Sequence, residues 1–174
     1  EIADKCEKFI HGNPSGIDVN QVLSDTPLLF SKKDGAIPLD FNLDSYLLII
    51  DTGVIGITKE TLKHIKQNFE NYKSYIDELG EITEKVIEPL KKKAIEIVGA
   101  YMYKAHDLLQ KLGVSHESND DVVNICKNNG ALGAKLTGGG AGGCCIALSK
   151  TKENAEKIQN ELAKKGYKSW IVTV

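Results

Sequence analysis

The 174-residue sequence is 41% hydrophobic and 26% charged, values near the globular average that exclude a disordered or fibrous chain. Its 22 basic and 24 acidic residues give a net charge of -2. Because lysines and glutamates are interspersed, we expect neither nucleic acid nor an anionic membrane as a partner. No apolar run approaches the roughly 18 to 20 residues of a membrane span, and no signal-peptide pattern is present at the start. We therefore expect a cytoplasmic protein with one domain and an attached arm.

The chain begins at Glu1, without a methionine and within a predicted helix. We therefore expect it to be part of a longer protein. The four cysteines show no CxxC spacing, and adjacent cysteines on a strand point to opposite faces, so we expect free thiols. These cysteines are Cys6, Cys126, Cys144 and Cys145.

Two short helices and a hairpin are predicted before the first buried strand. Residues 1–9 have apolar spacing typical of a helix end, and residues 15–23 follow Pro14, which favours a helix start. Residues 27–31 and 36–39 flank a polar, glycine-containing turn, which predicts a β-hairpin. The apolar run YLLIID at residues 46–51 predicts a buried strand.

Long amphipathic helices occupy the middle of the sequence. Apolar residues at helical spacing extend from Thr58 to Leu79, and Gly80 is expected to break or bend this helix. The pattern resumes from residue 82 to 112, where Pro89 is expected to kink or restart the helix. Ser118 or Asn119 is expected to cap the next helix. The remaining predicted elements are a helix at 120–129, strands at 134–137 and 144–149, a helix at 151–165 and a strand at 169–174.

From Tyr46 onward, these elements follow the βαββαβ order of ferredoxin-like folds, with extra helices in the first crossover. The predicted fold class is therefore α+β, with an antiparallel sheet and helices on one face. We expect residues 1–45 to hold a helix end, a motif and the hairpin, and residues 46–174 to form the second domain.

The segment KLTGGGAGGC, residues 135–144, contains five glycines in the six positions between two predicted strands. Glycine allows positive φ and lets an anion approach the main chain, so this loop is a candidate phosphate-binding nest. A flexible hairpin needs fewer glycines, and no Walker A lysine follows. The candidate residues are Gly138, Gly139, Gly140, Ala141, Gly142 and Gly143.

The segment HGNPSGID, residues 11–18, places Asp18 near the start of a short helix. The helix dipole favours the ionised carboxylate there, which could accept a proton or orient a lysine. Taken alone, an acidic residue in a first helical turn is usually only a favourable end charge.

These two segments resemble motifs of the mevalonate kinases in the GHMP kinase superfamily, which read HGNPSGVD and KLTGAGGGGC. DTGVIGITKE, residues 51–60, is similar to a third segment of that family, DTKVPRNTR. The resemblance extends from Glu7 to at least Cys145 and implies the fold of the GHMP kinase C-terminal domain for residues 46–174.

The resemblance implies transfer of the ATP γ-phosphoryl group to the 5-hydroxyl of mevalonate, with Mg²⁺. Asp18 matches the catalytic aspartate, and Glu7 matches a glutamate that binds Mg²⁺. His11 and Thr58 fall on the substrate side. Residues 138–143 match the phosphate-stabilising loop.

Several alternatives stay open. Ile55 and Gly56 replace a Pro-Arg pair of the family, so the acceptor could be that of another small-molecule kinase, such as a phosphomevalonate or homoserine kinase. A noncatalytic ligand-binding module of ferredoxin-like fold is the alternative from another class. The resemblance also implies that the N-terminal half of the enzyme is needed as a partner, and that this chain alone is inactive. Homodimerisation is left open.

Overall fold

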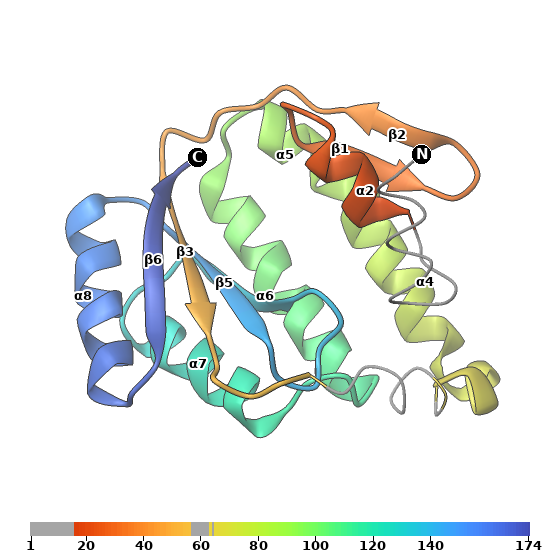
Figure 1. Ribbon diagram of the computed structural model, residues 1–174. Helices are drawn as coiled ribbons and strands as arrows, with labels where there is room; N and C mark the ends of the chain where they lie inside the picture. Colours follow the sequence, from red (N-terminus) through yellow and green to blue (C-terminus); the bar gives the residue numbers. More distant parts are fainter. Residues whose placement is uncertain (1–15, 57–62, 64) are drawn as a thin grey trace. The chain divides into compact units, whose positions relative to one another are not determined.

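The computed structural model describes residues 16–56, 63 and 65–174 of the chain. The chain divides into two compact units, Glu1–Phe41 and Asn42–Val174. Figure 1 traces the elements of both units. The predicted helix at residues 1–9 lies outside the described residues, as do Glu7, His11 and Thr58.

The described part of the first unit is a short helix followed by a hairpin. Helix α2 (Ile17–Val22) begins after Gly16, whose φ is 87°. Strand β1 (Leu28–Ser31) pairs antiparallel with β2 (Gly35–Pro38). The Gln21 side chain joins the helix to the hairpin, because it donates to the Thr26 carbonyl and accepts from the Leu28 N–H. The predicted short helix and hairpin are thus confirmed.

The second unit contains a four-stranded antiparallel sheet (Figure 1). Its strands are β3 (Tyr46–Asp51), β4 (Gly133–Thr137), β5 (Cys144–Ser149) and β6 (Lys168–Thr173). The spatial order is β4-β5-β3-β6, and every neighbouring pair is antiparallel. This is the ferredoxin-like strand order, which confirms the predicted α+β class.

The main core lies between one face of the sheet and the two helices α7 (Glu117–Asn128) and α8 (Lys152–Lys164). Leu48 and Ile50 of β3 are fully buried in it, as the period-two alternation of a strand requires. On the opposite face, Trp170 and its cross-strand partner Ile49 are partly exposed. The predicted coverage of one sheet face by helices holds for α7 and α8.

Three helices fill the first crossover, namely α4 (Phe69–Lys85), α5 (Ile87–Lys91) and α6 (Ile95–Lys111). Of the two outcomes predicted for Gly80, a break is wrong, because α4 continues through this residue. A mid-helix glycine costs only about 1 kcal/mol, and burial of Ile82 beyond it holds the last turn. The predicted restart at Pro89 is confirmed, since Pro89 lies in the first turn of α5.

The cap of α7 differs from the prediction. His116 occupies the N-cap position, and its Nδ1 accepts the Ser118 N–H at 3.1 Å. Asn119 completes a capping box by accepting the His116 N–H. A polar ring nitrogen thus replaces the hydroxyl or amide that the sequence pattern favoured at this position.

No helix in the described ranges combines the length and apolar character needed to cross a bilayer. Cys126, Cys144 and Cys145 are free thiols, as predicted for them. Cys6 lies outside the described residues.

His106 of α6 links that helix to β4. It is 2% exposed, its Nδ1 accepts the Leu136 N–H at 3.4 Å, and its Nε2 lies 3.2 Å from Asp120 Oδ1. Burial lowers the pKa of His106, outweighing the opposite effects of Asp120 and Asp107. His106 is therefore neutral in the folded protein at pH 7.

This lowered pKa predicts a pH-dependent stability. As pH falls below the unfolded pKa of about 6.5, the unfolded state gains a proton before the folded state, so stability drops until the folded pKa is passed. Urea titrations at pH 7.5, 6.5 and 5.5 measure the free energy of unfolding of the wild type and of His106→Gln. As pH falls, the variant should lose less of this free energy than the wild type, and the difference should reach at most about 1.4 kcal/mol per pH unit. Between pH 8 and 9, the free energy of unfolding should change with pH equally in the two proteins. An equal change below pH 6.5 would contradict the prediction.

Candidate active site

The glycine loop, residues 138–143, connects β4 to β5. Its backbone has positive φ at five of the six positions, including non-glycine Ala141 with a φ of 57°. Such φ values are readily adopted by glycine and strained for most other residues. The loop is therefore rich in glycine because its backbone conformation requires glycine, and not because it is flexible. The five positions are Gly138, Gly140, Ala141, Gly142 and Gly143.

The second half of the loop is fixed by hydrogen bonds to two separate backbone segments. The Ala141 N–H donates to the Val114 carbonyl at 2.7 Å. The Gly143 N–H donates to the Val54 carbonyl at 2.8 Å, while the Gly143 carbonyl accepts from both the N–H and the hydroxyl of Thr52. These bonds bring the segment after β3 against the loop.

The Asn119 side chain of α7 binds both backbone polar groups of Gly142, the remaining residue in this half of the loop. Its Oδ1 accepts the Gly142 N–H at 3.0 Å, and its Nδ2 donates to the Gly142 carbonyl at 2.9 Å. The side chain is completely buried and also approaches Cys145 Sγ at 3.4 Å. We predicted Asn119 only as a helix cap. Its second role could not be found from the sequence, because it depends on a contact 23 residues away.

The loop packs so closely that two of its glycines leave no room for a side chain. A Cβ on Gly140 would lie 2.3 Å from the Val114 carbonyl oxygen, and one on Gly142 would lie 2.8 Å from Val54. A Cβ on Gly56 would lie 2.5 Å from the Gly140 carbonyl oxygen. The departure from the family's Pro-Arg pair thus has a local physical reason, because this backbone excludes an arginine at position 56.

The first half of the loop is available to a ligand. No described residue accepts a hydrogen bond from the N–H groups of Gly138, Gly139 or Gly140, and the first two residues are exposed. The N–H groups of Ala141, Gly142 and Gly143 are engaged within the protein. An anion would therefore approach at the exposed Gly138 and Gly139, with the buried Gly140 and the second half of the loop serving as their rigid support.

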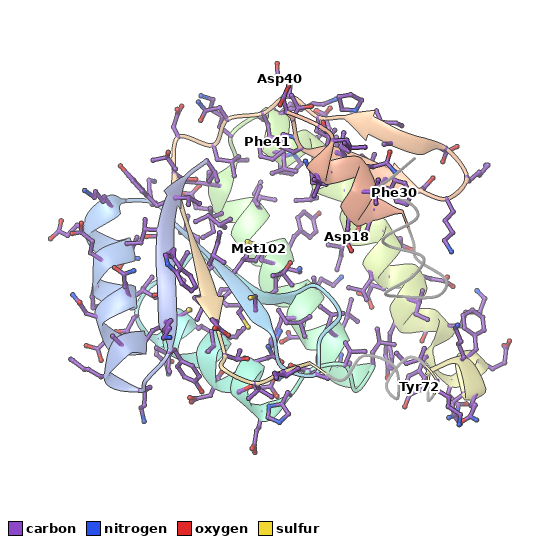
Figure 2. The ribbon with its side chains drawn as sticks, viewed as in Figure 1. Asp18, Phe30, Asp40, Phe41, Tyr72 and Met102 are labelled. Atoms are coloured by element: carbon purple, nitrogen blue, oxygen red, sulfur yellow. The ribbon has the colours of Figure 1, made fainter. Side chains whose placement is uncertain are left out.

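Asp18 lies in the first turn of α2 and is exposed (Figure 2). It makes no hydrogen bond or ion pair with another described residue. It belongs to the first unit, whereas the glycine loop belongs to the second. Their convergence around one triphosphate stays a prediction.

Within the described ranges, no three His, Cys, Asp or Glu side chains are grouped so as to hold a metal ion. Glu7, the predicted Mg²⁺ ligand, lies outside these ranges, as do His11 and Thr58. Mg²⁺ commonly keeps waters and phosphate oxygens as most of its ligands.

Removing the Asn119 side chain should destabilise the protein measurably. Asn119→Ala leaves the buried N–H and carbonyl of Gly142 without partners, and we expect a loss of about 2–4 kcal/mol. Asn124→Ala, at an exposed position of the same helix, is the matched control and should change stability by less than about 0.5 kcal/mol. Urea unfolding measures both variants, and similar values for the two would contradict the assigned contact.

Comparisons with known proteins agree with this geometry. The family description "GHMP kinases C terminal" matches residues 86–168. A mevalonate kinase from Aeropyrum pernix is 33% identical over 164 residues, covering 87% of this chain and 48% of the relative. A mevalonate kinase from Dictyostelium discoideum is 31% identical over 189 residues, covering 97% of this chain and 47% of the relative.

The fold of this chain is also similar to that of a mevalonate kinase. The crystal structure of L. major mevalonate kinase in complex with R-mevalonate has a TM-score of 0.84 and 28% identity, covering 96% of this chain and 55% of that chain. The chain thus spans about half the length of the relatives it matches. Motifs, sheet order and relatives together lead to one conclusion: this chain belongs to the GHMP kinase family and contains its C-terminal domain.

Proposed function

We propose that this chain is the C-terminal part of a mevalonate kinase, which transfers the γ-phosphoryl group of ATP to the 5-hydroxyl of mevalonate. The observation that carries this proposal is the fold similarity to an enzyme solved with R-mevalonate, at a TM-score of 0.84 over 96% of the chain. The two motifs HGNPSGID and KLTGGGAGGC supply the specific residues.

Under this proposal, the glycine loop stabilises the phosphates. Phosphoryl transfer asks the protein mainly to position its substrates and to stabilise charge in a loose transition state. The unengaged amides of residues 138 and 139 can donate to phosphate oxygens, because the bonds to Val114, Asn119 and Val54 prevent the loop from collapsing. A preorganised set of donors needs little rearrangement when charge develops.

The other roles rest on the family motifs. Asp18 would accept the proton of the acceptor hydroxyl as its oxygen attacks the γ-phosphorus, which the exposed position of this carboxylate permits. Glu7 would hold Mg²⁺, and the bound ion would neutralise charge on the phosphates. His11 and Thr58 would contact the acceptor. The sequence matches at these four positions support the roles.

We also propose the conditions in which the enzyme works. The upstream half of a GHMP kinase would complete the site, since this chain spans about half of its relatives. A cytoplasmic location fits the need for ATP and the free thiols of Cys126, Cys144 and Cys145. Homodimerisation stays open.

One assay tests the proposal. The chain, joined to its upstream half, is supplied with MgATP and separately with mevalonate, phosphomevalonate and homoserine, and ADP release and phosphorylated product are measured. We expect one ADP per phosphomevalonate formed, with mevalonate as the preferred acceptor. Preference for another acceptor would move the assignment within the superfamily, and ligand binding without turnover would favour a noncatalytic module.

A further inference from the structure

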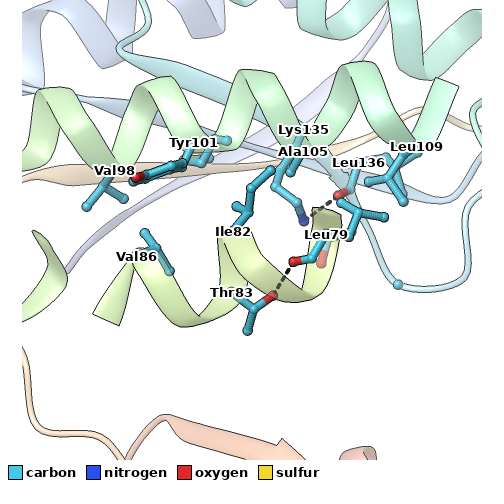
Figure 3. A pocket seen from close by; sticks show the side chains of 13 residues that line it. Leu79, Ile82, Thr83, Val86, Val98, Tyr101, Ala105, Leu109, Lys135 and Leu136 are labelled. Carbon is cyan, nitrogen blue, oxygen red and sulfur yellow. Dashed lines mark hydrogen bonds between the residues drawn. The ribbon is translucent and has the colours of Figure 1, made fainter. Parts of the chain in front are cut away.

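A cavity of about 350 Å³ lies between α4 and α6, within the second unit. This volume is at the lower end of the roughly 300–1,000 Å³ usual for small-molecule sites. Figure 3 shows that α4 and α6 face each other across it. Most of its lining side chains are apolar, and these include Leu79, Ile82, Val86, Val98, Met102 and Leu109.

One basic side chain enters this apolar space. Lys135 of β4 extends between the two helices (Figure 3), and its Nζ donates to the Leu136 carbonyl at 2.8 Å. An ammonium group has three N–H donors, and no described residue accepts a hydrogen bond from the other two. No carboxylate of a described residue forms an ion pair with Lys135.

The position of Lys135 is energetically unusual. Burial lowers the pKa of its amine, and the opposing effect comes from Cys145. A buried cation without an anionic partner is destabilising. An anion bound beside it would offset the free energy lost when the ammonium group leaves water. The nearby Thr83 hydroxyl is already engaged, since it donates to the Leu79 carbonyl at 2.9 Å.

We infer that this cavity binds a small monocarboxylate whose apolar chain lies between α4 and α6 and whose carboxylate accepts hydrogen bonds from Lys135. A single cation with two spare donors matches one carboxylate. A phosphate ester carries close to two negative charges at neutral pH and would find only one cation among the described lining residues. Gly138, the first residue of the glycine loop, also lines this cavity, but the inference is argued from Lys135 and the apolar walls and uses neither the loop amides nor Asp18.

Met102, labelled in Figure 2, offers a direct test, because it is the single methionine of the sequence and lines the cavity. In the full 174-residue chain with a ¹³C-labelled methionine methyl group, decanoate should shift the Met102 signal saturably. Decanol has the same chain without charge and should bind about 10- to 100-fold more weakly, because it lacks the charged hydrogen bond. Decyl phosphate and decyltrimethylammonium should also bind more weakly than decanoate.

A pair of variants tests the role of the amine. Lys135→Met keeps an unbranched side chain, removes the charge and should weaken decanoate binding about 10- to 100-fold, while decanol binding should change little. Lys92→Met removes an exposed lysine and should leave decanoate binding unchanged. Thermal unfolding confirms that each variant is folded.

Three results would overturn the inference. The first is a Met102 signal that decanoate does not shift saturably. The second is equal binding of decanoate, decanol and decyltrimethylammonium, which needs no variant to observe and would mean an apolar cavity without charge recognition. The third is tighter binding of decyl phosphate than of decanoate, which would assign the site to phosphate esters.

Discussion

Replacing Asp18 by Asn is expected to reduce kcat at least about 100-fold in the chain joined to its upstream half, because general acid–base groups contribute about 10²- to 10⁴-fold to a rate. Asparagine has nearly the same shape but cannot accept the hydroxyl proton as a carboxylate does. The helix should survive the change, since Asp18 is exposed and no residue of α2 is buried. ATP affinity should stay within about threefold of the wild type, a shift of under 1 kcal/mol.

Asp25→Asn is the matched control for this prediction. Asp25 is also an exposed aspartate of the first unit, so both substitutions remove one negative charge from the same unit. Steady-state kinetics with mevalonate and equilibrium binding of MgATP should separate the two variants. Wild-type turnover in Asp18→Asn would reject the catalytic role, and a matching loss in Asp25→Asn would attribute the effect to general electrostatics.

The sheet could be predicted from the sequence because its pattern is local. The run YLLIID predicted β3 with its observed bounds, Tyr46–Asp51, and the apolar pattern at 144–149 did the same for β5. The burial of a strand is visible in its local sequence, because every second side chain lies in the core and is apolar. The βαββαβ order then left few topologies to consider.

Features that depend on distant contacts could not be predicted in the same way. Gly80 suggested a helix break, but packing of Ile82 against α6 outweighs its weak helix propensity. His116 caps α7 through its ring nitrogen, which common capping preferences do not include. In both cases, tertiary or side-chain geometry decided the outcome.

The candidate site also combines a feature that the local sequence predicts with one that depends on distant contacts. The glycine content of residues 138–143 indicated a special backbone, and the positive φ values confirm that conformation. The sequence could not divide the loop into a half that is internally bonded and a half with unengaged amides. That division comes from Val54, Val114 and Asn119, which lie far from the loop in the sequence.

The close packing of this loop leads to a second large effect. Gly140→Ala is expected to destabilise the protein by about 4 kcal/mol. A positive φ costs an alanine about 1–2 kcal/mol, and the new Cβ would lie 2.3 Å from the Val114 carbonyl oxygen, so that the backbone must move. This movement would also break the 2.7 Å bond from the Ala141 N–H to the same oxygen.

Gly138→Ala separates the two causes. Gly138 and Gly140 share a φ of 77°, but a Cβ on Gly138 would meet no atom within 4 Å. The Gly138 variant should therefore show only the conformational cost of about 1–2 kcal/mol, and the difference between the two variants measures the collision with Val114. Urea unfolding of the 174-residue chain gives both values. Equal destabilisation would mean that the loop relaxes freely around Gly140, and the rigid support proposed for the amides of residues 138 and 139 would then be wrong.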